Sequence, residues 1–175
     1  MTVTRVFLIG FMGSGKTTVG KMLSHSLNWR FIDLDQLIEK KEGQSITQIF
    51  ATKGELAFRQ LEHEVLKEVA DYSNVIISTG GGTPCYHGNM DFINQKGLSI
   101  YLESDAETLK NRLLPAKKSR PLIADKSEEE LLNFIKEKLS EREPWYNKAK
   151  TKTDATCIGI TSYLNIIETY NKLNS

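Results

Sequence analysis

The feature that most constrains this chain is a glycine-rich segment between an apolar run and a helical pattern. Residues 10–17 read GFMGSGKT and match the pattern G-x-x-x-x-G-K-[ST]. The apolar run VFLI at residues 6–9 precedes them, and residues 16–27 carry apolar side chains at helical spacing. Glycines at such a place let successive backbone N–H groups face inward at the positive end of the helix dipole. The segment therefore predicts a phosphate-binding loop (P-loop) between a strand and a helix.

The polar residues of this loop predict what it binds. In loops of this pattern the lysine reaches the β- and γ-phosphates of a nucleotide, and this role falls to Lys16. The hydroxyl that follows ligates a Mg²⁺ ion that bridges the two phosphates, and this role falls to Thr17. A plain glycine turn is the alternative, but a chance match is expected in only about one chain in a hundred. The predicted ligand is a nucleoside triphosphate with Mg²⁺.

Short runs rich in β-branched residues alternate with longer segments of helical period along the whole chain. The predicted strands are residues 6–9, 30–33, 74–78, 98–102 and 155–158. Strands separated by helices favour an α/β fold with a doubly wound parallel sheet, whose ligands gather at the carboxyl ends of the strands. We expect residues 1–175 to form a single domain, because this length suits one compact core.

Composition narrows the class of protein. The 23 basic and 22 acidic residues give a formal charge of +1, which leaves no excess of cations for nucleic acid or a membrane surface. The N-terminal stretch lacks the pattern of a secretory leader, and no apolar run is long enough to span a bilayer. The two cysteines, Cys85 and Cys157, lie far apart. These features predict a cytoplasmic protein with free thiols that binds neither nucleic acid nor membranes.

Two acidic residues follow the second predicted strand, in the run FIDLDQL. Alternation along an extended chain would put Asp33 and Asp35 on one side, with Leu34 opposite, so that the two carboxylates share a site. The alternative is that Asp35 caps the following helix while Asp33 ends the strand in solvent. The P-loop nearby favours the shared site.

Two further segments have more than one interpretation. Three glycines, residues 80–82, follow the third strand, and this run is equally typical of a ligand-binding turn and of a flexible one. Residues 113–126 contain two prolines and a basic cluster and could form a flap over the site. The acidic run after them indicates the start of a helix capped by Ser127.

These motifs, in this order and at these separations, resemble the shikimate kinase family. They are GFMGSGKT, DLD, FATKGELAFRQLE, STGGG, SRPLI and EREPWY, and they span nearly the whole chain. The resemblance implies a three-layer α/β/α fold like that of nucleoside monophosphate kinases, with a five-stranded parallel sheet, a lid and a mobile substrate-binding region. It also implies transfer of the γ-phosphoryl group of ATP to the 3-hydroxyl of shikimate, a step of aromatic amino-acid (chorismate) biosynthesis.

The resemblance implies a role for each matching residue. Asp35 would bind the shikimate hydroxyls and act as the base, and Asp33 would hold Mg²⁺ through water beside Thr17. The substrate carboxylate would contact Arg59, Arg142 and the turn of Gly80, Gly81 and Gly82. ATP would contact Gly13, Ser14, Gly15, Lys16, Thr17, Thr18, Arg112 and Arg120. Arg112 would lie against adenine, and Arg120 would close over the phosphates as a catalytic residue together with Lys16 and Asp35. Taken singly, Arg59 is more typical of a stem packed on the core. The other three arginines are typical of ordinary surface charges, so their roles rest on the resemblance.

The chain departs from the family pattern at two places. The run after Arg142 reads Pro-Trp-Tyr-Asn where the family commonly has Pro-Leu-Tyr and then Glu. No proline follows Pro144, so the second wall of the adenine pocket is unassigned, with residues 158–161 as candidates. Two other functions stay open: a gluconate kinase-like enzyme, and a nucleotide-dependent switch, although NKAK and NKLN lack the aspartate of a guanine-reading motif. The protein is expected to be a monomer.

Overall fold

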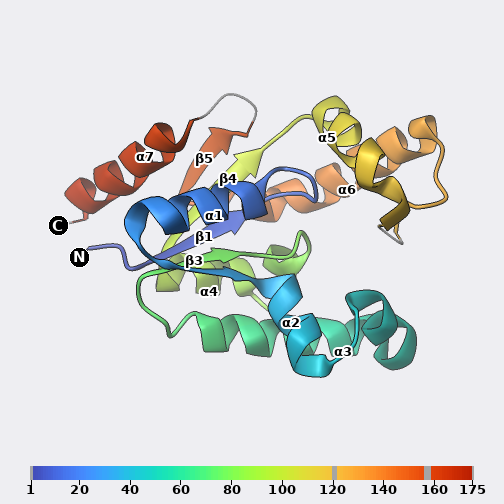
Figure 1. Cartoon of the computed structure of the whole chain (residues 1–175), viewed down its shortest axis with the longest axis horizontal. Helices are drawn as coiled ribbons and strands as arrows, with labels where there is room; N and C mark the ends of the chain where they lie inside the picture. Colours follow the sequence, from blue (N-terminus) through green and yellow to red (C-terminus); the bar gives the residue numbers. More distant parts are fainter. Residues whose placement is uncertain (1, 120–121, 156–158, 175) are drawn as a thin grey trace.

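The computed structural model describes residues 2–119, 122–155 and 159–174, and their strands form one parallel sheet (Figure 1). The strand order is β2-β3-β1-β4-β5. The strands are β1 (Arg5–Ile9), β2 (Arg30–Asp33), β3 (Val75–Ser78), β4 (Leu98–Glu103) and β5 (Thr151–Asp154). The predicted five-stranded parallel sheet of an α/β fold is therefore confirmed.

Helices connect the strands and cover both faces of the sheet. Among the described residues they are α1 (Lys16–Leu27), α2 (Leu34–Glu42), α3 (Ile46–Val69), α4 (Asn89–Lys96), α5 (Ala106–Leu113), α6 (Glu128–Tyr146) and α7 (Ile160–Leu173). There are also two short 3₁₀ helices: η1 (Thr83–Cys85) lies between β3 and α4, and η2 (Leu114–Ser119) directly follows α5.

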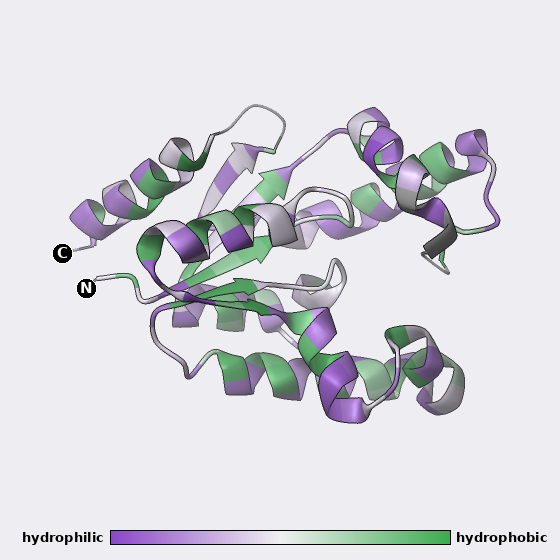
Figure 2. Cartoon of the chain, viewed as in Figure 1, coloured by the Kyte–Doolittle hydropathy of each residue, from purple (hydrophilic) through white to green (hydrophobic). Residues whose placement is uncertain are grey.

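Successive side chains of each strand face two separate cores, which produces the three layers. On one face, Leu8 of β1 packs in a core with Leu23 of α1 and Tyr163 of α7. On the other face, Phe7 of β1 belongs to the larger core, with Leu66 of α3 and residues of α2, α4, α5 and α6. Because helices cover both faces, the inner strands are mostly apolar and the helices are apolar mainly on their inward sides (Figure 2).

The prediction of the fifth strand at residues 155–158 is wrong. The strand comprises Thr151–Asp154, the polar run TKTD, and Ala155 follows it, while residues 156–158 lie outside the described part of the chain. As an edge strand, β5 pairs with β4 alone, and Thr153 is its one buried residue. An edge strand needs few apolar residues, so an apolar run does not mark its position in the sequence.

The register of the parallel strands brings three carboxyl ends level with one another. Ser78 at the end of β3 pairs with Leu8 of β1 on one side and with Asp33 of β2 on the other. The segments that follow these strands therefore leave the sheet at the same edge, where ligands bind in doubly wound folds.

The segment that joins α5 to α6 contacts the larger core through Leu114 and Ile123. Ile123 is fully buried in the larger core, whereas its neighbour Leu122 is 69% exposed. Ser127 then caps α6 as predicted: its Oγ accepts from the backbone N–H of Glu130, whose carboxylate accepts from the N–H of Ser127. None of the helices in the described ranges combines the length and the apolar character that crossing a bilayer requires.

Gly97, at the start of β4, offers a test of the close approach of β4 to β1. An added Cβ would lie 2.5 Å from the backbone oxygen of Arg5, which the sheet holds in place. We expect Gly97→Ala to lower the free energy of unfolding by about 1–3 kcal/mol in urea titrations, because the strands must move apart. The exposed α4 residue Gln95 provides the control, and Gln95→Ala should change this free energy by less than about 0.5 kcal/mol. Equal stability of the two variants would contradict the close approach.

Candidate active site

The P-loop passes from β1 into α1 through glycines in left-handed conformations. Gly15 is the N-cap of α1 and has a φ of 94°, which residues with a side chain rarely adopt. Gly10 also requires glycine, because an added Cβ would lie 2.8 Å from the backbone oxygen of Leu102. Since Gly15 has no side chain to cap α1, the first N–H groups of the helix form the kind of nest that binds phosphate.

Two polar side chains of the loop are held under its backbone. Lys16 is only 8% exposed, and its ammonium donates to the backbone oxygens of Gly10 (2.7 Å) and Phe11 (2.8 Å). The hydroxyl of Ser14 is buried and has no hydrogen-bond partner within the described residues. A buried polar atom without a partner is costly, so this hydroxyl suits a polar ligand at the loop.

A cavity of about 320 Å³ opens above the P-loop. It is lined by Met12, Gly13, Gly15, Lys16, Thr17, Thr18, Asp33, Asp35, Ser78, Thr79, Gly81 and Arg112. The fold thus brings together most of the expected nucleotide contacts, both aspartates and the glycine turn, although these residues come from four separate parts of the chain.

The two aspartates line this cavity, but the backbone that carries them has a different conformation from the one predicted. Helix α2 begins at Leu34, so the predicted extended alternation over Asp33 and Asp35 is wrong. Asp33 is the helix cap and accepts from the N–H of Gln36, while its Oδ2 accepts from the hydroxyl of Thr17 at 2.9 Å. Asp35 lies in the first turn of α2. Both carboxylates nevertheless line the same cavity.

Asp35 has the electrostatics of a proton acceptor. Burial, together with the negative charges of Glu62 and Asp33, raises the pKa of its carboxyl to about 6, although Lys16 opposes the shift. The carboxylate abuts the glycine turn, because an added Cβ at Gly80 would lie 2.7 Å from Asp35 Oδ1. A carboxyl group with a pKa near 6 is suited to general-base catalysis near neutral pH.

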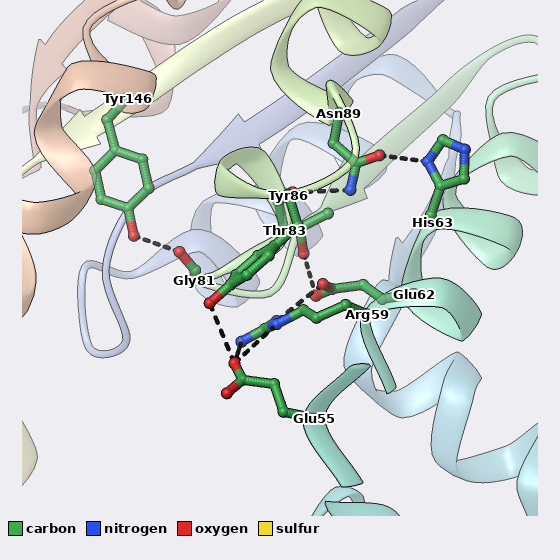
Figure 3. Close-up of polar contacts among 9 residues, drawn as sticks. All are labelled: Glu55, Arg59, Glu62, His63, Gly81, Thr83, Tyr86, Asn89 and Tyr146. Atoms are coloured by element: carbon green, nitrogen blue, oxygen red, sulfur yellow. Dashed lines mark hydrogen bonds and ion pairs between the residues drawn. The ribbon is translucent and has the colours of Figure 1, made fainter. Parts of the chain in front are cut away.

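Arg59 is held in a cage of carboxylates and aromatic rings (Figure 3). It is 8% exposed; its Nη1 donates to Glu62 at 2.9 Å, and its Nη2 and Nε donate to Glu55 at 3.3 Å. The Arg59 guanidinium carbon lies 4.2 Å from the centre of the Tyr86 ring. Burial works against the charge, but Glu62, Tyr86 and Glu55 together outweigh burial and raise the pKa of Arg59 above its ordinary value. The guanidinium is therefore oriented and permanently charged.

Arg142 reaches the glycine turn from the other side, on α6. An added Cβ at Gly81 would lie 3.1 Å from Arg142 Nη1, and one at Gly82 would lie 2.8 Å from both terminal nitrogens of Arg59. The turn itself is held by hydrogen bonds, including that from the N–H of Thr83 to the oxygen of Gly80 at 3.2 Å. Of the two interpretations of the glycine run, the structure thus favours a fixed turn against which two arginines lie.

The remaining predicted residues fall into two groups. Arg112, near the end of α5, lines the cavity and donates through Nη2 to the backbone oxygen of Ala155 at 3.2 Å. Arg120 and Ile158 lie outside the described residues, so the expected phosphate contact and part of the candidate adenine wall have no structural description.

Sequence reasoning missed two buried groups of the site. Glu62 is 1% exposed and accepts from Arg59 and from the hydroxyl of Thr83 at 2.5 Å. The signal for Glu62 was present, because an arginine and a glutamate three residues apart on a helix can pair. Tyr146 donates its hydroxyl hydrogen to the backbone oxygen of Gly81, 65 residues away, at 2.5 Å. A contact over that separation leaves no periodic signal in the sequence.

The oxygen atoms of Thr17 and Asp33 fit a magnesium ion better than a metal held by protein alone. They lie 2.9 Å apart on the wall of the cavity. Within the described ranges, no three His, Cys, Asp or Glu side chains come together as a metal cage. Mg²⁺ is usually bound by one or two protein oxygens together with nucleotide phosphates and water, so this donor set is sufficient.

A phosphate-binding nest that opens towards a half-buried carboxylate with a raised pKa, beside two arginines at a glycine turn, is the arrangement of a P-loop kinase acting on a small anion. Comparison with known proteins identifies the family. The family model described as shikimate kinase matches residues 12–168. The chain belongs to the shikimate kinase family, so it uses ATP to phosphorylate shikimate in the route to chorismate.

Individual relatives agree with this assignment. The chain is 48% identical over 148 residues to the shikimate kinase of Phocaeicola vulgatus, with 85% of each chain covered. The crystal structure of shikimate kinase from Bacteroides thetaiotaomicron is 39% identical and has a TM-score of 0.90, covering 97% of this chain and 98% of that one. Shikimate kinase from Acinetobacter baumannii in complex with shikimate is 33% identical, with a TM-score of 0.85 and coverage of 97% and 95%.

The gluconate kinase alternative has structural support only at the level of the fold. A gluconokinase from Sinorhizobium meliloti has a TM-score of 0.59 and 16% identity, covering 97% of this chain and 94% of that one. Such a likeness shows a shared architecture and says nothing of the substrate.

The raised pKa of Asp35 predicts the acid side of the pH profile. Only the deprotonated carboxylate can accept a proton, so kcat/KM for shikimate should fall about tenfold per pH unit below pH 6 and level off above pH 7. The measurement is kcat/KM at saturating Mg²⁺-ATP between pH 5 and 8, with circular dichroism to exclude unfolding. A midpoint near pH 4, the value for an ordinary aspartate, would contradict the role of burial.

Proposed function

We propose that the cavity holds ATP and shikimate so that Asp35 accepts the proton of the 3-hydroxyl as its oxygen attacks the γ-phosphoryl group. The observation that carries this proposal is the arrangement around the glycine turn. Asp35 abuts Gly80, Arg142 lies against Gly81 and Arg59 lies against Gly82. A proton acceptor and two cations thus lie around three consecutive residues, which suits a small acid that bears hydroxyl groups.

The two arginines would bind the substrate carboxylate. Their planar guanidinium groups can each present two parallel N–H donors, and Arg59 is already oriented by its pairing with Glu62. Because Arg59 and Glu62 lie on the same helix, one turn apart, the substrate would not have to order this arginine when it binds.

The transfer step needs mainly alignment and charge stabilisation. The proton of the 3-hydroxyl passes to Asp35, a bond forms between the hydroxyl oxygen and the γ-phosphorus, and the bond from this phosphorus to the oxygen of the leaving ADP breaks. Lys16, Thr18 and the loop residues Gly13, Ser14 and Gly15 would bind the phosphates. The ammonium of Lys16 would stabilise the negative charge that develops on the phosphate oxygens.

Thr17 would hold Mg²⁺ directly and Asp33 would hold it through water, as their adjacent oxygens allow. Mg²⁺ supplies positive charge to the β- and γ-phosphates when it is bound. Asp33 also caps α2, so the same carboxylate would fix the first turn of the helix that carries Asp35.

Residues 113–126 would form a lid that closes over the nucleotide. In this proposal Arg120 contacts the phosphates and Arg112, which lines the cavity, lies against adenine. The exposed Leu122 beside the buried Ile123 supports a segment that packs on the core through some residues and presents others to solvent. Closure would exclude water and so limit hydrolysis of ATP in the absence of shikimate.

The whole chain would act as one domain, residues 1–175, and as a monomer in the cytoplasm. A formal charge of +1 supports the absence of nucleic-acid and membrane partners. Size-exclusion chromatography with light scattering should give a mass near 19.8 kDa; a mass twice as large would contradict the monomer.

The activity itself is tested by ADP release from ATP with shikimate, gluconate or no acceptor, each with Mg²⁺ and with EDTA. We expect release only with shikimate and Mg²⁺, and a product phosphorylated on the 3-hydroxyl. Release supported by gluconate alone would leave the kinase fold intact but overturn the roles of Asp35, Arg59 and Arg142. Full activity in EDTA would overturn the metal assignment.

Substitution of the arginines tests the carboxylate site. Arg142→Ala should raise the KM for shikimate strongly and spare that for ATP, because loss of one partner of a desolvated charge pair costs about 2–5 kcal/mol. Arg59→Ala should do the same, with an added loss of stability because Glu62 is left buried without its cation. Arg30→Ala is the control, since this exposed arginine lies at the opposite end of β2. An unchanged KM in Arg142→Ala would contradict the site.

A further inference from the structure

We propose that Tyr146 is a positioning residue for the substrate: it fixes the peptide between Gly81 and Gly82 and docks the helix that carries Arg142 onto the glycine turn. The inference rests on the proposed function, in which this turn and Arg142 bind the substrate carboxylate. Tyr146 would not touch the substrate itself. Its effect would be transmitted through the backbone of the turn.

Tyr146 is a buried donor aimed at a single acceptor. It is the last residue of α6 and is fully buried, and its ring lies 5.1 Å from the ring of Tyr101 on β4. Its hydroxyl donates to the backbone oxygen of Gly81 at 2.5 Å, on the opposite side of the turn from Arg59 and Glu62 (Figure 3). Burial raises the pKa of this hydroxyl, although Arg142 opposes the shift, so the group remains a donor at neutral pH.

The other carbonyl groups of the turn are held by its own backbone. The oxygen of Gly80 accepts from the N–H of Thr83 at 3.2 Å, and that of Gly82 accepts from the N–H of Cys85 at 2.9 Å. The middle carbonyl, that of Gly81, is instead held by a side chain from α6. Glycine has no side chain to restrict its peptide planes, so this middle peptide needs a restraint from outside the turn.

Holding this carbonyl also orients an N–H group. In a trans peptide the C=O of one residue and the N–H of the next point in opposite directions, and the described chain contains no cis peptide bonds. When the oxygen of Gly81 points to Tyr146, the N–H of Gly82 therefore points away from it. The guanidinium of Arg59 lies against Gly82. Tyr146 thus keeps a backbone donor directed away from α6, beside an arginine proposed to bind the carboxylate.

The same hydrogen bond sets the position of Arg142. Arg142 lies four residues before Tyr146 on α6, so the two side chains share one face of the helix. Arg142 Nη1 lies 3.1 Å from the place where a Cβ of Gly81 would be, and the Tyr146 hydroxyl binds the carbonyl of that residue. Arg142 and Tyr146, one helical turn apart, thus both lie against Gly81. The hydrogen bond of Tyr146 holds α6, and with it Arg142, against the glycine turn.

The test compares two buried tyrosines from the same ring pair. Tyr146→Phe keeps the ring and removes the hydroxyl, and we expect it to raise the KM for shikimate about five- to tenfold, with the KM for ATP and kcat within about twofold of the wild type. Tyr101→Phe is the matched control, because it removes the hydroxyl of the other ring of the pair, which makes no hydrogen bond to the turn, and its KM for shikimate should match the wild type. Thermal unfolding of both variants reports any general loss of packing.

Three results would overturn the inference. The first is an unchanged KM for shikimate in Tyr146→Phe, and the second is an equal rise in both variants. The third is a fall in kcat together with a rise in the KM values for both shikimate and ATP and a lowered melting temperature. This combination indicates a structural role alone. Arg142→Ala distinguishes this failure from failure of the proposed function. If Arg142→Ala raises the KM for shikimate while Tyr146→Phe does not, the carboxylate site stands and only the role of Tyr146 is wrong.

Discussion

The parallel pairing of β3 between β1 and β2 is the constraint on which the active site depends. All four residues of β3 are buried, and Ser78 is level with Leu8 on one side and Asp33 on the other. The glycine turn, the P-loop and the start of α2 therefore leave the sheet side by side. A shift of β3 by one residue would exchange the side chains that face the two cores, so the apolar packing keeps the polar loops in register.

Buried charge gives this edge of the sheet its chemistry. Arg59 and Glu62 are each almost fully buried, and their pairing offsets part of the free energy that desolvation of two charges costs. The negative charge of Glu62 also repels the carboxylate of Asp35, and this repulsion is one reason why the pKa of Asp35 is raised. The ion pair that orients an arginine therefore also contributes to the basicity of a nearby carboxylate. A residue larger than glycine at position 80 would collide with this carboxylate, so the backbone and the charges fit one another.

Sequence patterns predicted correctly those features that depend on interactions between residues close together in the chain. The P-loop, the four apolar strands and the Ser127 cap of α6 each depend on residues that are neighbours in the chain, and the structure has all of them. The prediction was wrong at β5, where pairing with β4 makes a strand of a polar run. It was also wrong about the conformation of Asp33 and Asp35, because a helix that starts at Leu34 replaces the extended chain. At β5 a contact with another element outweighed the local preference. At α2 the cap by Asp33, which is itself local, starts the helix earlier than predicted.

The sequence by itself determined the family, the phosphate-binding loop and the set of residue types available for phosphoryl transfer, because these follow from the identity and spacing of neighbouring residues. Only the tertiary structure decided which carboxyl group has a raised pKa, which carboxylate orients Arg59 and which side chain holds the middle of the glycine turn. Burial, charge repulsion and hydrogen bonding depend on distances in space. Between Tyr146 and Gly81, which are 65 residues apart in the chain, folding alone sets that distance.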